Sequence, residues 1–519
     1  MSLLEPVPPK GLPFPKIPGP ATSDRVCIVG AGPAGVHMAL SLKRRGFTNL
    51  TIYEKSNRVG GKSFDINYRG VAQPMGTIFA ESNYFDNLIP LAQEFGVGEI
   101  VRIPSPSAWT TNSASDAGSQ LLTGEYVLAT VAKLTNSSSP EVNLGFLLQT
   151  VVLYVRLHKE MFGDYPGDLM LQPSAEVMAR VRGTFLDFLD RENMLALLPV
   201  FKFSHELQGY GYVNEISALY GLIWNNPKLI IVSALRALKR DTDELTVYVL
   251  RDGFEKVWKT IVDKENINIQ FNTDIYSITR NKNYIDMKIW EYSNLKNIKC
   301  DFLIWTPEMN TFLRTVKNAS QSELSLFRGL KPEIFTASLV NMRNRNGPYS
   351  AFTRNLDSNN IDGRVTAEFN MMGVLTPGIR TKRGLAKYNN NHSELKTLFV
   401  LQMAKNYSNE HLLNDILRKH FTKGFNATDL EILNTISWPY FPRWSPEEME
   451  MGRHWQVNKP HALVFHLPRN HVTLFHVFML QVLKLQGQQR MWYAGSSVSF
   501  ESVRGVMEYN NLLLRQMLN

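Results

Sequence analysis

The chain has 519 residues, of which 44% are hydrophobic and 20% charged, and its formal net charge at pH 7 is +9. This length and apolar content exclude a disordered chain and indicate two or three structural layers or domains around a large core. The most apolar stretch, residues 144–157, contains Gln149 and Arg156, and it is shorter than the ~18–20 residues of a membrane-spanning helix. We therefore expect no transmembrane segment, whereas peripheral contact with a membrane stays open.

The excess of basic residues favours anionic partners such as fatty acids, phospholipid surfaces or nucleotides, and it is equally consistent with an ordinary basic surface. These residues are dispersed in short groups such as residues 43–45, so we expect no nucleic-acid binding. Cys27 and Cys300 are the only cysteines, which excludes a disulfide scaffold, zinc fingers and cysteine-ligated clusters. Cys27 lies inside an apolar run, where we expect a small core residue.

The first 20 residues contain seven prolines, which remove backbone donors and disfavour both helix and sheet. No charged segment followed by an apolar core is visible, so the sequence shows no signal peptide. We expect residues 1–23 to form an extended arm, and we take the cytoplasm as the default compartment.

A dinucleotide-binding pattern follows this arm. Residues 25–29 predict a strand, residues 30–35 a glycine-rich turn, residues 36–45 a helix and residues 50–54 a second strand that ends in an acid. The glycines permit a tight turn, close approach of a pyrophosphate and close helix–strand packing, while the acid accepts ribose hydroxyls. The pattern predicts a dinucleotide site that includes Gly30, Gly32, Pro33, Ala34, Gly35, Glu54 and Lys55.

A second glycine turn, Arg58-Val-Gly-Gly-Lys-Ser63, comes directly after the acid. NAD-dependent dehydrogenases do not usually need such a turn, and the alternative interpretation is a plain surface turn. Here the chain resembles the flavin amine oxidase-like superfamily, whose second motif is R-x-G-G-[RK]. The resemblance implies FAD as the cofactor, with Gly60, Gly61, Lys62 and Ser63 in its site.

Three later segments are similar to the same superfamily. Residues 253–258 predict a helix start before paired strands over residues 267–278, in which Ile275 matches the position whose backbone touches the adenine. Residues 300–307 resemble the strand that returns to the sheet. Residues 491–509 predict a strand, a turn and a closing helix whose N-terminal turn would face the ribityl and pyrophosphate groups. These matches add Ile275, Gly495, Glu501, Ser502 and Val503 to the implied FAD site.

The positions of the cysteines bear on whether the flavin is bound covalently. Covalent amine oxidases tether it through a cysteine near the C-terminus, and no cysteine follows Cys300. We therefore expect non-covalent FAD; a covalent bond between the flavin and a histidine is the alternative.

Segments outside the flavin motifs resemble the polyunsaturated fatty acid double-bond isomerases of this superfamily. The similar segments, in the same order, are residues 74–78, 209–220, 438–444 and 493–500. The Trp–His pair of amine oxidases is missing from the first of them. Arg443 replaces a histidine of the isomerases, and residues 110–205 and 345–395 are longer than in compact members, so pocket length and substrate identity stay open.

This second resemblance implies further site residues. Met75, Gly76, Thr77 and Ile78 would lie beside the isoalloxazine ring, with Tyr210, Tyr440 and Phe441 as pocket walls and Arg102 as a carboxylate partner. Each segment also fits a structural role: a turn before a packing helix at 209–212, a rigid core corner at 438–444, and a solvated Arg102. A helix expected over residues 222–238 is either a lid or an amphipathic surface helix.

No catalytic triad or metal-binding motif stands out, and we expect no metal. The resemblance implies an isomerase in which flavin N5 takes a hydride from the bis-allylic carbon of a polyunsaturated fatty acid. The hydride then returns two positions away, which gives a conjugated diene without net redox change. The alternatives are an FAD-dependent oxidase or desaturase of an amine or a lipid, and a catalytically silent flavin-binding protein. The oligomeric state stays open.

The expected fold class is α/β. A Rossmann-like FAD-binding domain of the glutathione reductase or amine oxidase type is expected beside a mixed-sheet substrate domain with a helical insertion. Residues 24–109, 245–309 and 485–519 would form the FAD-binding domain, residues 110–244 the helical lid or insertion, and residues 310–484 the substrate domain. The substrate is expected at their junction, in front of the flavin.

Overall fold

The computed structural model describes most of the chain. The described residues are 19–68, 71–80, 82–102, 107–110, 120–164, 174–206, 208–237, 248–292, 294–343, 351–353, 364–369, 395–404, 410–425, 430–450 and 479–518. The expected extended arm, residues 1–23, lies outside the described residues except for its last five, and so does most of the long segment 345–395.

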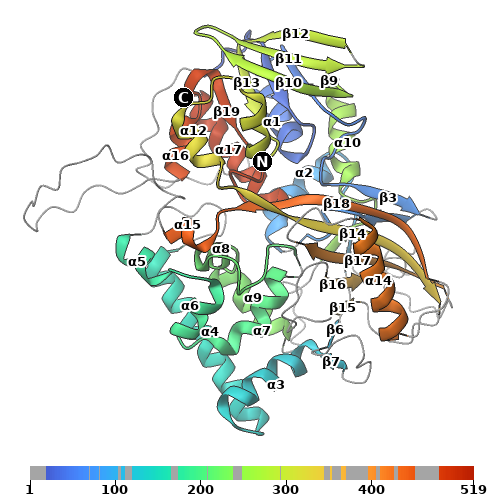
Figure 1. Ribbon diagram of the computed structural model, residues 1–519, viewed down its shortest axis with the longest axis vertical. Coiled ribbons are helices and arrows are strands. Elements are labelled where there is room, and N and C mark those ends of the chain that lie inside the picture. The colour runs from blue at the N-terminus through green and yellow to red at the C-terminus, as the bar shows by residue number, and fades with distance from the viewer. Residues whose placement is uncertain are drawn as a thin grey trace, which may run out of the picture.

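The first sheet has five parallel strands in the order β19-β13-β1-β2-β9 (Figure 1). Its strands are β1 (Val26–Val29), β2 (Leu50–Tyr53), β9 (Ile269–Gln270), β13 (Phe302–Trp305) and β19 (Met491–Tyr493). All residues of β1 and β13 are buried, as is typical of a parallel sheet covered on both faces. Segments far apart in the sequence thus build one sheet, and the predicted Rossmann-like architecture is confirmed.

Helices from both ends of the chain cover this sheet. Helix α1 (Pro33–Lys43) packs against α17 (Val503–Leu518) and α10 (Glu255–Glu265). In the first contact, the side-chain amide of Asn510 donates to the carbonyl of Ala34 at 2.8 Å. The C-terminal helix therefore lies directly against the helix that follows the glycine-rich turn.

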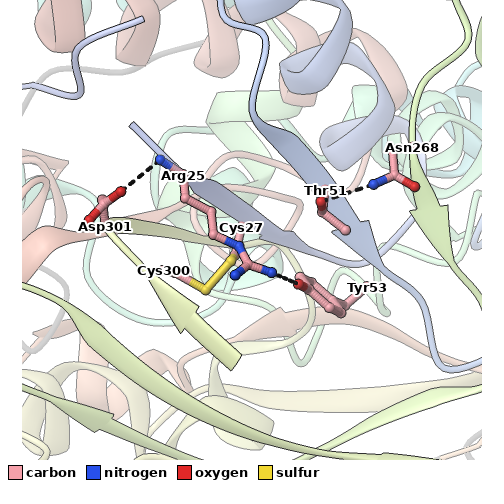
Figure 2. The surroundings of a disulfide bond; sticks show 7 residues. All are labelled: Arg25, Cys27, Thr51, Tyr53, Asn268, Cys300 and Asp301. Atoms are coloured by element: carbon pink, nitrogen blue, oxygen red, sulfur yellow. Dashed lines mark hydrogen bonds between the residues drawn. A yellow bond between two sulfur atoms is a disulfide. The ribbon is translucent and has the colours of Figure 1, made fainter. Parts of the chain in front are cut away.

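A disulfide links the first sheet to a neighbouring antiparallel sheet (Figure 2). That sheet consists of β10 (Thr273–Arg280), β11 (Ile285–Glu291) and β12 (Asn294–Cys300). Cys300, at the end of β12, bonds to Cys27 of β1 across 5.8 Å between their Cα atoms. Cys27 is a buried core residue, as expected, whereas its disulfide to Cys300 was not predicted. The pairing of β1 with β13 brings these two positions together, and no local sequence pattern shows it.

The second sheet has seven strands in the order β18-β14-β17-β16-β15-β6-β7. These are β6 (Ser107–Thr110), β7 (Gln120–Leu122), β14 (Lys331–Arg343), β15 (Ala351–Thr353), β16 (Arg364–Phe369), β17 (Leu395–Ala404) and β18 (Glu431–Arg443). Only the pair β15–β6 is parallel among these ladders, so the sheet is mixed, as expected. Two strands before residue 123 join it, which the sequence patterns did not predict. The domain boundaries given above stay predictions.

Two small ladders connect these parts. They are β3 (Asp65–Tyr68) with β4 (Val71–Pro74), and β5 (Ile100–Arg102) with β8 (Tyr248–Leu250). The other described helices are η1 (Ser82–Asp86), α2 (Leu88–Glu94), α11 (Met309–Thr315), α12 (Gln321–Phe327), α14 (Glu410–Phe425), α15 (Pro446–Glu450), α16 (Met479–Leu485) and η5 (Gln488–Arg490). Among the described helices, none is long and apolar enough to cross a membrane.

A helical region lies on the side of the molecule away from the first sheet (Figure 1). Its elements are α3 (Thr123–Thr135), α4 (Pro140–Phe162), α5 (Ala175–Arg180), α6 (Phe185–Arg191), η2 (Leu195–Leu197), α7 (Leu198–Phe201), the π-helical turn η3 (Lys202–Glu206), α8 (Ala218–Trp224) and α9 (Pro227–Ala237). The expected continuous helix over residues 222–238 is wrong, because α8 ends at Trp224 and α9 begins at Pro227. Proline lacks the N–H that a continuing helix needs and suits a first helical position.

Candidate functional site

A cavity of about 460 Å³ lies at the carboxyl ends of the parallel strands. Gly30 follows β1, Glu54 follows β2, Thr306 follows β13 and Gly495 follows β19, and all four residues line the cavity. Open α/β sheets bind ligands at this edge, where the strand order reverses direction. The order β13-β1-β2 places that reversal at β1, directly before the glycine-rich turn.

Most of the predicted site residues meet in this cavity. Those that line it are Gly30, Gly32, Pro33, Ala34, Glu54, Lys55, Gly61, Lys62, Ser63, Gly76, Thr77, Ile78, Tyr210, Ile275, Tyr440, Gly495, Glu501, Ser502 and Val503. Gly35, Gly60, Met75 and Phe441 lie outside the lining. The backbone of Arg102 pairs with Tyr248 in the β5–β8 ladder, and its side chain lies outside the described part of the chain.

The three glycines of the first turn have different surroundings. A Cβ on Gly35 would lie 1.9 Å from the carbonyl oxygen of Gly30, so this position needs glycine for packing. A Cβ on Gly32 would find its nearest neighbour, a Cα of Gly61, at 3.7 Å, which is an ordinary contact. Gly32 has φ −76° and precedes α1 without a side-chain cap, so unpaired N–H groups of that helix are left for an anion. The open space at Gly32 fits a pyrophosphate.

Glu54 is held by hydrogen bonds to both of its oxygens. Oε2 accepts the backbone N–H of Ala31 at 2.7 Å, and Oε1 accepts the N–H and the hydroxyl of Ser56 at 2.8 and 2.7 Å. A carboxylate offers about four acceptor positions, so one is left for a ribose hydroxyl. The side chain of Lys55 is largely exposed, and its ion pair with Asp274 at 3.2 Å joins two exposed side chains and adds little stability.

Lys62 lies between two carboxylates. Its Nζ is 2.9 Å from Glu501 and 3.2 Å from Glu308, and it lies 5.5 Å from the centre of the Tyr440 ring. Burial acts to lower the pKa of Lys62, but the nearby carboxylates of Glu501 and Glu308 outweigh it and raise that pKa above its ordinary value. Lys62 is therefore a permanent cation that neutralises one of its two partners.

The second glycine turn is supported from behind by Arg58. Its Nη2 donates to the carbonyl of Gly61 at 2.6 Å, and its guanidinium lies 4.3 Å from the centre of the Phe64 ring. Gly60 has φ +113°, and a Cβ there would lie 2.4 Å from the carbonyl of Ser63. Gly60 thus shapes the turn, while Gly61 lines the cavity.

Asp65 joins this turn to the start of α10. Its Oδ2 accepts the N–H of Glu255 at 2.7 Å, and Glu255 in return accepts the N–H of Asp65 at 3.0 Å. Burial raises the pKa of the Asp65 carboxyl to about 7. The hydrogen bond from the backbone N–H of Glu255 lowers this pKa, but its effect is smaller. A buried acid with a pKa near neutrality therefore lies at the start of β3, two residues after the second glycine turn.

The backbone of residues 75–78 lies close to the second glycine turn, residues 58–63. A Cβ on Gly76 would lie 1.7 Å from the carbonyl of Lys62, and the Thr77 hydroxyl lies 2.9 Å from that of Ser63. Met75 is fully buried behind the cavity, where its carbonyl accepts the indole N–H of Trp438 at 2.7 Å. Gly76, Thr77 and Ile78 thus line the cavity at the point where the sequence predicts the flavin ring.

Part of the cavity lining is an aromatic and apolar wall. Tyr210 and Tyr440 lie 6.0 Å apart with nearly parallel rings, and Phe335 of β14 packs 5.0 Å from Tyr440. Leu401 of β17 and Tyr84 of η1 complete this wall. Sequence analysis missed Phe335, Leu401 and Tyr84, because each is an ordinary apolar residue of a strand or turn and only the tertiary structure brings it to the cavity.

Phe441 lies behind this wall. It is 3% exposed and packs against Tyr220 and Phe500 with ring centres 5.4 and 5.0 Å apart. It also contacts the edge of Tyr210 at 5.5 Å. Phe441 therefore packs against Tyr210 but does not line the cavity.

Comparisons with known proteins agree with this fold. Residues 28–95 match the family model described as an NAD(P)-binding Rossmann-like domain. A polyenoic fatty acid isomerase from Ptilota filicina is 25% identical over 217 residues, which are 40% of this chain and 42% of that protein. The chain thus spans less than half of the length of this curated relative.

Two solved structures illustrate the similarity in fold. The CLA-producing fatty acid isomerase from P. acnes has a TM-score of 0.71 at 16% identity, over 96% of this chain and 100% of that one. Cyclohexylamine oxidase from Brevibacterium oxydans has a TM-score of 0.61 at 13% identity, over 95% of this chain and 99% of that one. These findings confirm the predicted fold class and agree with the resemblance to the flavin amine oxidase-like superfamily.

Proposed function

We propose that this chain, which has the fold of amine oxidase-like flavoproteins, is an FAD-dependent enzyme that moves a double bond in a polyunsaturated fatty acid to give a conjugated diene. One observation carries the proposal. One cavity is lined both by the glycine-rich turn with Glu54 and by the aromatic residues Tyr210, Tyr440 and Phe335. A cofactor bound at the glycine-rich turn would therefore share its cavity with an aromatic and apolar wall.

The residues around the glycine-rich turn and Glu54 fit FAD. Glu54 has a free acceptor position for the ribose, and the open space at Gly32 adjoins the uncapped start of α1. Ser502 and Val503, at the start of α17, offer a second helix N-terminus on the same cavity. Bound FAD would supply a hydride acceptor at this site. The absence of a cysteine after Cys300 favours non-covalent binding.

The wall residues suit an acyl chain. An isomerisation of this kind needs one methylene fixed in place and water excluded, and it needs no general base. Tyr440 is partly buried, and desolvation raises the pKa of its phenol well above the ordinary value, so the ring stays neutral. Neutral aromatic faces at Tyr210 and Tyr440 can stabilise positive charge that develops on the acyl chain. The two relatives named as fatty acid isomerases support this choice of substrate.

A second candidate is an oxidase of an amine. Two carboxylates, Glu308 and Glu501, surround the single cation of Lys62, which leaves one excess negative charge beside the aromatic wall. Such a site favours a cationic substrate, and one solved structure of similar fold is an amine oxidase. An oxidase would pass electrons to oxygen and release hydrogen peroxide.

The experiment that separates these candidates is anaerobic mixing of the FAD-loaded protein with linoleic, arachidonic or eicosapentaenoic acid. Absorbance of conjugated dienes and of the flavin is followed in the same cuvette. The proposal predicts growth of diene absorbance while the flavin stays oxidised at steady state. Bleaching of the flavin without diene, reversed by air with release of peroxide, would contradict it and favour the oxidase. A parallel titration with putrescine and cyclohexylamine tests the amine alternative.

A further inference from the structure

A residue with a strained backbone lies directly behind the cavity wall. Phe441 has φ +48°, in the left-handed region that residues with a side chain rarely adopt. It belongs to a bulge, because Tyr440 pairs with Glu333 and Arg443 pairs with Lys331, so that two residues of β18 lie opposite one of β14. Bulges and strained residues of this kind persist only where surrounding groups hold them, and they are common beside functional sites.

Two buried charged side chains hold the backbone of Phe441. Its N–H, which the bulge removes from the ladder, donates to Oε2 of Glu501 at 3.0 Å. Its carbonyl accepts from Nη1 of Arg443 at 3.4 Å, and Arg443 also pairs with Glu333 on the neighbouring strand. Glu501 is 7% exposed and Arg443 is 9% exposed. The strained peptide is therefore fixed on both sides by groups that water does not reach freely.

Glu501 connects this wall to the predicted cofactor site. Its second oxygen, Oε1, accepts from Lys62 of the second glycine turn at 2.9 Å. Its neighbour Phe500 packs against Phe441 and Tyr210, with both ring-centre distances at 5.0 Å. Phe500 therefore contacts the wall residue Tyr210, and Glu501 contacts the backbone of Phe441 behind the wall. Glu501, Ser502 and Val503 all line the cavity.

We propose that Glu501 is a positioning residue for the substrate wall. By accepting the N–H of Phe441, its carboxylate stabilises the left-handed bulge and so keeps the adjacent Tyr440 ring in the cavity. The ion pair with Lys62 orients the carboxylate for this bond. This inference rests on the proposed function only in naming a fatty acid as the molecule that meets the wall; the backbone contact itself does not depend on it.

The first measurement is hydrogen exchange of residues 438–444 by mass spectrometry, which needs no substrate. Glu501→Ala removes the acceptor of the Phe441 N–H, so exchange in this segment is expected to become faster. Glu501→Gln keeps an amide oxygen at the same reach and is expected to restore most of the protection. Glu323→Gln is the matched control, because Glu323 is also a buried carboxylate, pairs with Arg280 and does not line the cavity. It is expected to lower thermal stability without changing exchange at 438–444.

The second measurement is binding of linoleic acid, read from the change in flavin absorbance of the FAD-loaded variants. Glu501→Ala is expected to weaken binding about tenfold, and Glu501→Gln by no more than about threefold. The FAD affinity of each variant is titrated separately, so that a loss of cofactor is not mistaken for a loss of substrate. Glu501→Asp, which keeps the charge but is one carbon shorter, replaces the alanine variant if the latter does not fold, and it is expected to behave like it.

Three results are informative. Unchanged exchange at 438–444 in Glu501→Ala would overturn the inference. Equal impairment of Glu501→Ala and Glu501→Gln would also overturn it, because the carboxylate would then act through Lys62 alone. If no fatty acid perturbs the flavin of the wild-type protein, the proposed function fails, while the exchange measurement still decides the role of Glu501.

Discussion

The carboxylate of Glu54 accepts the backbone N–H of Ala31 at 2.7 Å. This bond joins the acid at the end of β2 to the glycine-rich turn after β1, so the two elements of the dinucleotide pattern are fixed relative to one another. The same carboxylate is also held by Ser56 at 2.7 Å. An acid that is oriented before its ligand arrives loses less entropy on binding.

Replacement of Glu54 is expected to weaken FAD binding. Glu54→Ala removes both the acceptor for the ribose and the bond to Ala31, and hydrogen bonds to charged groups contribute about 1.5–3 kcal/mol each. The affinity for FAD, measured by titration of the apoprotein, should fall about ten- to a hundredfold. Glu54→Gln keeps one side-chain acceptor, so its affinity for FAD should lie between that of the wild type and that of Glu54→Ala. An unchanged affinity in Glu54→Ala would remove this residue from the site.

Two glycines of the same turn should respond differently to alanine. In Gly32→Ala the new Cβ meets only Gly61 at 3.7 Å, so the apoprotein should fold normally. The methyl group would occupy the space proposed for the pyrophosphate, and FAD affinity should fall about ten- to a hundredfold. In Gly35→Ala the Cβ would lie 1.9 Å from the carbonyl of Gly30, so the free energy of unfolding should fall by about 3 kcal/mol or more.

The pair of variants tests the site against a purely structural role of the turn. Thermal unfolding of the apoproteins and FAD titration are measured side by side. If both variants lost stability to the same extent, or if Gly32→Ala bound FAD normally, the open space at Gly32 would not be a pyrophosphate site.

The disulfide between Cys27 and Cys300 should contribute to stability. It closes a loop over a sequence separation of 273 residues, and native disulfides of this kind stabilise by about 2–4 kcal/mol. The double variant Cys27→Ala, Cys300→Ala should unfold at lower denaturant concentration than the oxidised wild type. Wild type kept under reducing conditions, without alkylation, should approach the variant. A wild-type protein whose thiols both react with an alkylating reagent after denaturation without reductant would show that the bond does not form.

The buried acid Asp65 gives a pH prediction. Its pKa is raised by burial to about 7 in the folded protein, above its ordinary value of 3.8. Between these values the folded state binds the proton more tightly than the unfolded chain, so Asp65 lowers stability as the pH rises through this range. Asp65→Asn keeps an acceptor for the N–H of Glu255 and removes the charge. The variant should therefore gain stability over wild type at pH 8, and the gain should shrink toward pH 4.

The comparison with Asp65→Asn is needed because buried histidines change the stability of the protein with pH in the opposite direction. Burial lowers the pKa of His37 to about 4, so stability is lost as the pH falls from 6.5 toward 4. The difference between variant and wild type, measured by urea unfolding at each pH, cancels this contribution. A difference that does not change with pH would mean that Asp65 titrates normally.

The dinucleotide half of the fold could be predicted from the sequence because its pattern is local. The strand, the turn from Gly30 to Gly35, the helix and the acid Glu54 follow one another within 30 residues, and each glycine has a distinct steric role. The break between α8 and α9 was predictable in principle, since Pro227 marks it, but the apolar periodicity on both sides concealed it.

The substrate side could not be predicted to the same depth. Phe335 and Leu401 reach the cavity through pairing of β14 with β17, and neither residue differs from an ordinary strand residue in the sequence. Phe441 was expected to line the cavity with Tyr440, but the bulge places it behind the wall, where its backbone meets Glu501. Pairing register and bulges depend on contacts between distant segments, which a single sequence does not show.

The most direct test of the proposed reaction uses linoleic acid deuterated at the bis-allylic carbon. The FAD-loaded protein is mixed with it under anaerobic conditions in ordinary water, and the product is analysed by mass spectrometry. Transfer of a hydride away from this carbon and back to the same chain predicts a conjugated diene of unchanged mass, with deuterium at a new carbon. A conjugated product that has lost deuterium to water would contradict this route, and the absence of any diene with peroxide formed on admission of air would contradict the isomerase itself.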